Sequence, residues 1–308
     1  MGNDNMKMYD ITSAPKVEVE HVLKSDRKEL KYIEKILKSL NVNMDYFYMN
    51  ANKIKFKTDN SVSGILKKCS YYDVFNNEII TSEEHYDDSI THELLHMSSC
   101  ITKDTKTYTG YHQADFTNNI QIGTALNEGC TALFDLRYCG DYTPNKKEIE
   151  KGVYPLSKDI VSDLEITLGS ETLLKAYFNA DLKTVYQQLS NLMGYKRTMA
   201  FLYTFDALFY CSDSVSKFRP RMIHNFYPEI LVYTAEAFYT KITDKYKAGT
   251  LSKEDYIMFL DLVKSILARQ ITILKIPITE DMSYAYSSIK KHYNKNYDER
   301  LKLNKTVK

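Results

Sequence analysis

The stretch "DDSITHELLHMSSC", residues 87–100, places two of the chain's seven histidines four residues apart. His92 and His96 lie on one side of any helix at that spacing, one turn apart. Glu93 follows the first histidine and points about 100° away from it around the helix. The stretch therefore predicts a helix with one face of imidazoles and a separate apolar core face, made by Tyr86, Ile90, Leu94 and Met97.

The composition is that of a folded globular chain with balanced charge. The 308 residues are 44% hydrophobic and 26% charged, and 41 basic against 40 acidic side chains leave a formal net charge of +1. So small a net charge provides no field that attracts nucleic acid or acidic lipid. The chain has no run of about 18 apolar residues and no secretory pattern in residues 1–16. We therefore expect a cytoplasmic protein whose partners include neither nucleic acid nor a membrane.

The cysteines are odd in number, widely scattered and never arranged as CxxC. This pattern is unlike a disulfide framework or a zinc ribbon and favours buried free thiols in a reducing compartment. Cys100 lies eight residues beyond His92, a helix rise of about 12 Å, which is too far for both to bind one ion. The five residues are Cys69, Cys100, Cys130, Cys139 and Cys211.

Residues 1–80 are expected to form a small subdomain of helix and sheet. Residues 1–16 are expected to be an N-terminal segment without regular structure. Over residues 17–40, apolar residues recur every three or four positions, which predicts one long or two short helices. Between Asn41 and Thr81 the pattern changes to alternating, β-branched and aromatic residues. That change predicts a small, mostly antiparallel sheet of short strands.

From Thr81 onward, signals for helix ends dominate. One helix is expected from about Thr81 to Cys100, and further helices over residues 123–139, up to Gly169, between Asp181 and Gly194, and over residues 228–249 and 252–275. The sequence therefore predicts an α+β fold that is mostly helical. Its three parts are residues 1–80, residues 81–140 with the helices of the site, and a helical C-terminal subdomain over residues 141–308.

Two histidines at this spacing can both bind one zinc ion at about 2.0–2.1 Å, but a third ligand is needed. His112, Asp115 and Glu128 compete for that role. Glu128 lies in "IGTALNEGCTAL", residues 122–133, where small residues would let two helix backbones approach closely. Asp135, seven residues further, could orient a ligand, although a surface Asp is equally ordinary there.

"HELLH" followed by "LNEG" resembles the gluzincin class of zinc metallopeptidases, which includes the thermolysin-like proteases and the zinc aminopeptidases. The resemblance implies that His92, His96 and Glu128 bind Zn²⁺. It also implies that Glu93 is the general base and that a zinc-activated water hydrolyses peptide bonds. A zincin-like fold follows from it, with a small N-terminal β-sheet, an active-site helix and a helical C-terminal subdomain.

The resemblance covers residues 91–133 and departs from the class in two ways. The 31 residues that separate His96 from Glu128 are more than in either named family, and one position departs from the thermolysin-like pattern. Ala132 stands where that pattern has an acidic residue near the ligands. In this class a Tyr or His from the C-terminal portion commonly stabilises the oxyanion. The candidates for that role here are Tyr195, Tyr203, Tyr210, His224 and Tyr227.

Several functional alternatives stay open at the level of sequence. The main one is a non-catalytic helical binding protein that retains a remnant of a zinc site. Glu93 favours an enzyme, because zinc binding alone needs only the ligands. The substrate is expected to be a peptide or protein, and a regulatory or toxin-like peptidase with one dedicated substrate would share the chemistry. An edge strand within residues 63–75 that pairs with an extended peptide would make an endopeptidase, whereas an acidic cluster that captures a free amine would make an aminopeptidase. The sequence does not decide between the two.

Overall fold

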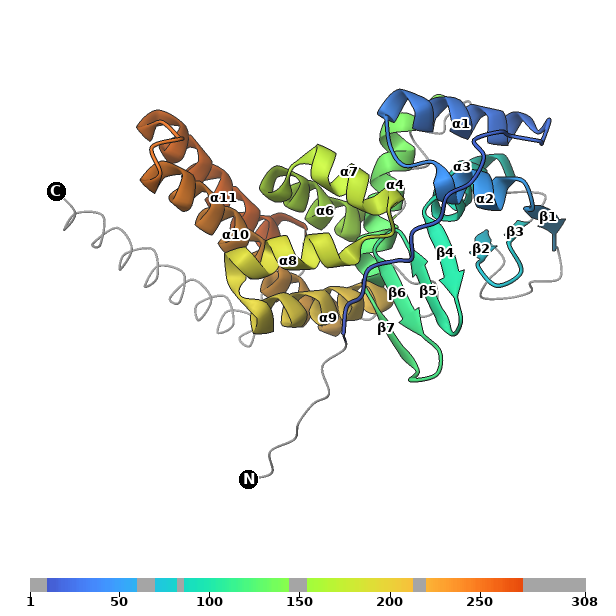
Figure 1. The fold of residues 1–308 in the computed structure, drawn as a ribbon. Helices are drawn as coiled ribbons and strands as arrows, with labels where there is room; N and C mark the ends of the chain where they lie inside the picture. Colours follow the sequence, from blue (N-terminus) through green and yellow to red (C-terminus); the bar gives the residue numbers. More distant parts are fainter. Residues whose placement is uncertain (1–9, 60–69, 82–85, 144–153, 213–219, 274–308) are drawn as a thin grey trace.

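The computed structural model describes residues 10–59, 70–81, 86–143, 154–212 and 220–273. Helices and short strands form the N-terminal half, and helices alone form the C-terminal half (Figure 1). The α+β, mostly helical class is therefore confirmed. The elements of the N-terminal half are α1 (Lys28–Leu40), α2 (Asp45–Ala51), β1 (Lys55–Thr58), β2 (Tyr71–Asp73), β3 (Glu78–Thr81), α3 (Tyr86–Ser98), β4 (Cys100–Lys103), β5 (Lys106–Thr109), β6 (His112–Asp115), β7 (Ile120–Ile122) and α4 (Thr124–Tyr138).

Two of the C-terminal helices, α6 and α8, end at the glycines that the sequence indicates. Gly169 caps α6 and Gly194 caps α8, while the Asp181 side chain accepts a hydrogen bond from the Thr184 N–H at 3.1 Å at the start of α8. By contrast, α10 begins at Pro220, earlier than expected, so that Pro228, the expected first residue, lies inside the helix. The C-terminal helices are α6 (Pro155–Leu168), α7 (Ser170–Phe178), α8 (Leu182–Met193), α9 (Tyr195–Ser212), α10 (Pro220–Lys247) and α11 (Lys253–Ile273).

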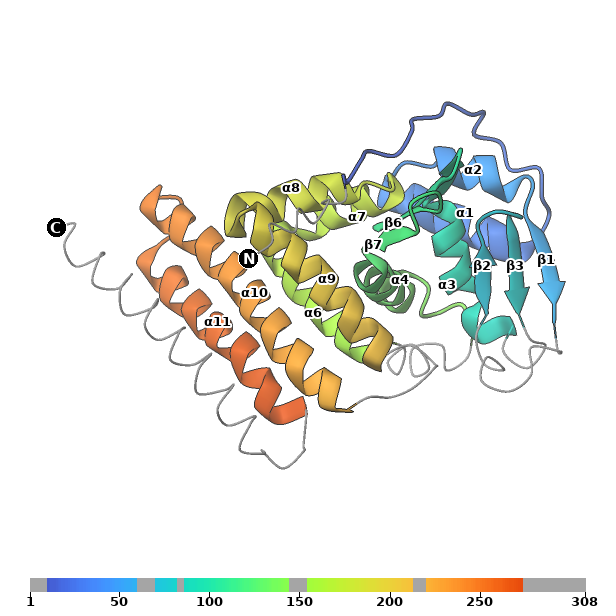
Figure 2. The same ribbon diagram turned by 90° about the horizontal axis from the view of Figure 1, so that it is seen from below.

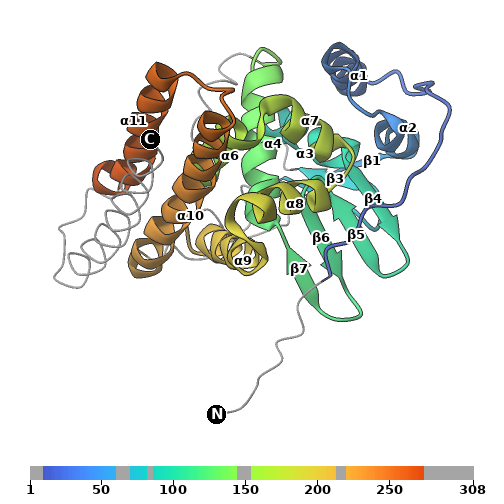
Figure 3. The same ribbon diagram turned by 60° about the vertical axis from the view of Figure 1, so that its left-hand side comes forward.

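The expected helix over residues 17–40 is wrong in its first part, since the helix begins at Lys28. "VEVE" at residues 17–20 alternates β-branched and charged residues, which favours extended backbone over helix. The apolar residues of this part still contribute to the core: Val19 and Leu23 pack against it from a segment without regular structure. Figure 3 shows this N-terminal segment running across the strands of the second sheet.

The first sheet has the strand order β1-β3-β2. β1 pairs with β3 in parallel and β2 pairs with β3 antiparallel, so the expected antiparallel sheet is in fact mixed. Residues 45–51 form α2 instead of a strand and bury Phe47 and Tyr48 in the core. Figure 2 shows the three strands side by side next to α3.

A second sheet, absent from the sequence-based expectation, is formed by the chain that connects the two helices of the site. Residues 100–122 form an antiparallel meander in the order β4-β5-β6-β7. Its turns contain residues with positive φ, namely Asp104, Gly110 and Asn119. These turns join short runs rich in Thr, Tyr and Ile, residue types that favour strands.

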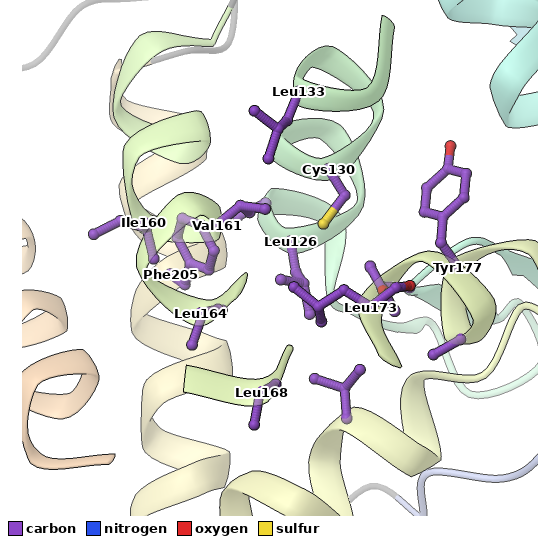
Figure 4. Close-up of a cluster of buried hydrophobic side chains, with 14 of the residues drawn as sticks. Leu126, Cys130, Leu133, Ile160, Val161, Leu164, Leu168, Leu173, Tyr177 and Phe205 are labelled. Carbon is purple, nitrogen blue, oxygen red and sulfur yellow. The ribbon is translucent and has the colours of Figure 1, made fainter. Parts of the chain in front are cut away.

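α4 connects the two halves through a buried apolar face. Leu126 and Leu133 of α4 lie on the side that faces α6, and Val161 of α6 points back toward α4 (Figure 4). The buried cluster continues through residues of all three expected parts of the chain. Cys100, Cys130, Cys139 and Cys211 are free and buried, as expected; Cys69 lies outside the described residues. Among the described residues, no helix is long and apolar enough to cross a membrane.

Asp206 of α9 fixes the position of α4. Its two carboxylate oxygens accept hydrogen bonds from the backbone N–H groups of Gly123 and Ala125, each at 2.8 Å. The first N–H groups of a helix have no partner within the helix, and a carboxylate there also interacts favourably with the helix dipole. Asp206 is 8% exposed, so water does not easily replace it.

Asp206→Asn should lower the free energy of unfolding by about 1–3 kcal/mol, because an amide NH₂ would face one of these two buried N–H donors. Urea denaturation measures the change. Asp261→Asn, on the exposed face of α11, is the control and should stay within about 0.5 kcal/mol of the wild type. An equal stability of the Asp206→Asn protein would show that the carboxylate does not hold α4.

Candidate metal centre

α3 and α4 pack against each other and bring together residues that are far apart in sequence. Near the C-terminal end of α3, His96 Nδ1 lies 3.2 Å from Asn127 Nδ2 near the start of α4. Further back on α3, the Thr91 hydroxyl donates to Asp135 Oδ1 at 2.6 Å, near the end of α4. The two helices therefore run in opposite directions, and Glu128 faces the histidines.

Three ligand atoms converge at this crossing. His92 Nε2 lies 3.2 Å from His96 Nε2, and Glu128 Oε2 lies 3.4 Å from each of them. Around a tetrahedral zinc with bonds of 2.0–2.1 Å, neighbouring ligand atoms are about 3.3 Å apart. The triangle of two nitrogens and one carboxylate oxygen thus fits zinc in both size and donor type. Within the described residues, this trio is the group of His, Cys, Asp and Glu side chains arranged closely enough to hold an ion.

The site is buried, and its charges are strongly coupled. Burial alone would raise the pKa of Glu128, but the two imidazoles, His96 foremost, hold that pKa well below its usual range. Burial lowers the pKa of His92. Burial also opposes protonation of His96, but the Glu128 carboxylate reverses the effect and raises that pKa. Two imidazoles and a carboxylate in such a place favour a cation between them.

Glu93 lies beside this trio and is 6% exposed. Burial raises the pKa of its carboxyl group to about 8, while the positive charge of His96 and a hydrogen bond from the Tyr72 backbone oppose the shift. Tyr72 belongs to β2, the end strand of the first sheet. Glu93 therefore lies between the ligands and a sheet edge, and burial raises the affinity of its carboxyl group for a proton.

His96 Nδ1, the ring nitrogen that does not belong to the trio of ligand atoms, has a hydrogen-bond partner in either tautomer. Asn127 Nδ2 can donate to Nδ1, because Asn127 Oδ1 already accepts from the Tyr111 N–H. The Thr131 hydroxyl, 3.4 Å away, can accept from Nδ1–H, since its own hydrogen goes to the Asn127 carbonyl. The second arrangement leaves Nε2 with a free electron pair, as a metal ligand requires. Tyr177 supports it by a 2.6 Å hydrogen bond to the Thr131 hydroxyl.

His92 is held differently. Its Nδ1 is buried and has no hydrogen-bond partner in the part of the chain that the structure describes. Asp135 is fully buried, so the alternative of a surface Asp is wrong, and it binds the hydroxyl of Thr91, the residue before His92. Asp135 therefore positions α3 itself, a function that the spacing on α4 did not indicate.

Two glycines let other elements pack closely against α4. A Cβ on Gly129 would lie 2.8 Å from the carbonyl oxygen of Ser157, so this glycine serves the contact with α6, whereas the sequence had suggested a contact with the histidine helix. Gly110, in the β5-β6 turn, has φ +55°, and a Cβ there would lie 2.2 Å from Asn127 Oδ1. The turn thus rests directly on the residue that precedes Glu128.

The remaining candidates from the sequence are separate from the trio. Asp115 caps its own turn by accepting hydrogen bonds from Thr117 and Asn118. Cys100 accepts a hydrogen bond from the Thr109 hydroxyl. Of the candidate oxyanion donors, Tyr195, Tyr203 and Tyr210 are exposed, Tyr227 is in the core and His224 is partly buried. Among the three exposed tyrosines, Tyr210 is the one whose pKa the charge of Glu128 raises slightly, after burial as the main cause.

Tyr154 is a residue of the site that the sequence analysis missed. Its ring lies 5.9 Å from the His92 ring and 5.3 Å from the Phe209 ring. It precedes α6 with φ 43° and ψ 54°, a left-handed conformation that costs energy for a tyrosine. No motif includes Tyr154; a Tyr followed by a Pro at a helix start is the only local signal.

In comparisons with known proteins, no family model, no curated protein and no solved structure matches the chain.

The purified protein should contain one zinc per chain, and His96→Ala or Glu128→Ala should remove most of it, because two ligands hold a zinc ion far more weakly than three. Elemental analysis after dialysis measures the zinc content. Asp115→Ala is the control and should keep a full equivalent. If Glu128→Ala keeps its zinc while Asp115→Ala or His112→Ala loses it, the third ligand is misassigned.

Cys100→Ala and Cys130→Ala should leave the zinc content unchanged, since neither thiol belongs to the trio of ligand atoms. Each substitution should cost on the order of 1 kcal/mol in stability, because each thiol is buried. Elemental analysis and urea denaturation of the same samples separate the two effects. Loss of zinc in either variant would identify a thiolate ligand.

Proposed function

We propose that the protein is a zinc-dependent peptidase of gluzincin type, with His92, His96 and Glu128 as ligands of Zn²⁺. The observation that supports this most is the triangle of ligand atoms with sides of 3.2, 3.4 and 3.4 Å. A structural zinc site usually has four protein ligands, whereas a catalytic site has three and keeps one position open. Three ligands with a buried carboxylate beside them favour catalysis.

Glu93 is the general base in this proposal. When bound, zinc supplies positive charge that polarises a substrate carbonyl and acidifies a water molecule. Glu93 accepts the proton of that water and passes it to the amine that leaves. Its position suits the task, because it follows His92 on the same helix turn and its carboxylate is shielded from bulk water.

We further propose that the fold is zincin-like and that an extended peptide binds along β2. β2 is the end strand in the order β1-β3-β2 and runs antiparallel to β3. The hydrogen bond between the Tyr72 backbone and Glu93 brings this strand next to the base. An end strand can add a peptide through main-chain hydrogen bonds, and such binding suits an endopeptidase more than an aminopeptidase.

Glu93→Gln should fold, bind one zinc and bind substrate, but should lower the cleavage rate by about 10²–10⁴, because the amide cannot accept a proton. An unbiased peptide-library digest by the wild type identifies a substrate, and the rates are then compared at equal zinc content. Glu29→Gln, a buried carboxylate on α1 that is 4% exposed, is the matched control and should keep its activity. Undiminished turnover by the Glu93→Gln protein would remove Glu93 from the mechanism. If the wild type binds zinc but cleaves nothing in the library, the alternative of a non-catalytic binding protein is favoured.

A further inference from the structure

The two histidines of the proposed zinc site are held in different ways. His96 Nδ1 lies 3.2 Å from Asn127 Nδ2 and 3.4 Å from the Thr131 hydroxyl, so side chains of α4 fix the ring from behind. His92 Nδ1 is buried and has no hydrogen-bond partner within the described ranges. A histidine that binds zinc almost always has its second ring nitrogen hydrogen-bonded, and that bond sets the orientation of the ring. The orientation of His92 therefore depends on the side chains that pack against it.

In the part of the chain that the structure describes, the His92 imidazole meets two other rings. The centroid of the His96 ring is 4.9 Å away, and that of the Tyr154 ring is 5.9 Å away with the planes inclined by 55°. Both distances lie in the range of about 4.5–7 Å over which aromatic rings attract one another. Tyr154 in turn packs at 5.3 Å against Phe209, a residue of α9 that is buried in the core. Tyr154 thus connects the His92 ring to the core.

The backbone of Tyr154 is anchored to the helix that carries the third proposed ligand. Its carbonyl oxygen accepts a hydrogen bond from the Lys158 N–H at 2.9 Å, at the start of α6. The first turn of α6 packs closely on α4, since a Cβ on Gly129 would lie 2.8 Å from the Ser157 carbonyl oxygen. Gly129 directly follows Glu128 in the sequence. The Tyr154 ring and the Glu128 carboxylate therefore belong to one packed unit.

Tyr154 keeps this position in an unfavourable backbone conformation. Its φ of 43° and ψ of 54° lie in the left-handed region, which is uncommon for a residue with a bulky side chain. Pro155 follows it, and a residue before a proline prefers extended backbone. Such a conformation persists only where the surrounding structure determines it, and functional sites are enriched in such cases. An extended backbone here would direct the Cα–Cβ bond away from the present contact with His92.

We propose that Tyr154 is a positioning residue that keeps the His92 imidazole oriented toward the triangle of ligand atoms and thereby raises the affinity for zinc. This inference rests on the proposed function, because it requires the zinc site, and it adds a residue that lies outside the sequence motifs. A side chain already held in its bound orientation loses less conformational entropy when the ion binds. The aromatic ring is the part that acts, since the contact with His92 is made ring to ring.

Three substitutions separate the ring of Tyr154 from its backbone. Tyr154→Phe keeps the ring and should leave the Kd for zinc within about twofold of the wild type, measured by competition with a chelator at pH 7. Tyr154→Ala and Tyr154→Gly both remove the ring, but only glycine accommodates the positive φ without strain. Both should raise the Kd about tenfold or more, the usual effect of losing a group that orients a metal ligand. Tyr186→Ala, which removes a partly buried ring that contacts Tyr195 on α9, is the control and should bind zinc normally.

Cobalt in place of zinc tests the geometry of the site, because the visible absorption of Co²⁺ depends on the arrangement of its ligands. At saturating cobalt, the Tyr154→Phe protein should give the spectrum of the wild type. The Tyr154→Ala and Tyr154→Gly proteins should give a shifted or weaker band, because His92 approaches the ion in another orientation. A tyrosine that served only the start of α6 would change the midpoint of urea denaturation and leave the zinc Kd and the cobalt spectrum unchanged.

The outcomes distinguish failure of this inference from failure of the proposed function. If the wild type binds zinc and the Tyr154→Gly protein binds it as tightly, the positioning role is excluded while the zinc site stands. If Tyr154→Ala alone weakens binding, the backbone conformation and not the ring is responsible, and the proposal is wrong. Weaker binding by Tyr154→Phe would assign the effect to the hydroxyl and would also overturn it. If the wild type binds no zinc, both fail together.

Discussion

The burial of several ionisable groups at one helix crossing is the constraint on which the rest of the structure depends. His92, His96 and Glu128 lie within 3.4 Å of one another at their nearest atoms, and Glu93 is buried beside them. Removing such groups from water is costly unless each is paired or neutralised. The pKa of Glu128 is low and that of Glu93 is high because the first faces two imidazoles and the second lacks comparable pairing. A carboxylate that binds and a carboxylate that takes up a proton are therefore distinguished by their surroundings alone.

α4 transmits this constraint to the surrounding structure. Its N-terminus is held by Asp206 from α9, and its side is in close contact with α6 at Gly129. The β5-β6 turn meets it at Asn127 through Gly110. Glu128 is thus fixed by elements from both halves of the chain. The same three contacts also leave little freedom for a shift of one ligand relative to the other two.

Local signals in the sequence predict much of this molecule. The spacing of His92 and His96 predicts that the two imidazoles share one helix face, but it left His112, Asp115 and Glu128 as candidates for a third group, and the resemblance selected Glu128. Gly169, Asp181 and Gly194 mark helix ends correctly, since capping depends on a few neighbouring residues. The meander was missed because strand pairing joins residues whose partners a local pattern does not reveal. Tyr154, Asp206 and the Thr131–Tyr177 contact were missed for the same reason, as each acts on the site from a distant element.

The position of the meander between the two ligand helices has a consequence for the order of folding. His92 and Glu128 are 36 positions apart, and the chain between them contains β4, β5, β6 and β7. Bringing the ends of so long a loop together lowers the conformational entropy of the chain. Here the loss is divided into smaller steps, because each hairpin that forms shortens the part of the loop that is still open. The two histidines, four residues apart, are neighbours as soon as their helix turn forms, whereas the glutamate arrives only after the last hairpin closes. We therefore expect the complete trio to form late in folding, since a nascent chain synthesised only as far as β7 carries two of the three groups and not the third.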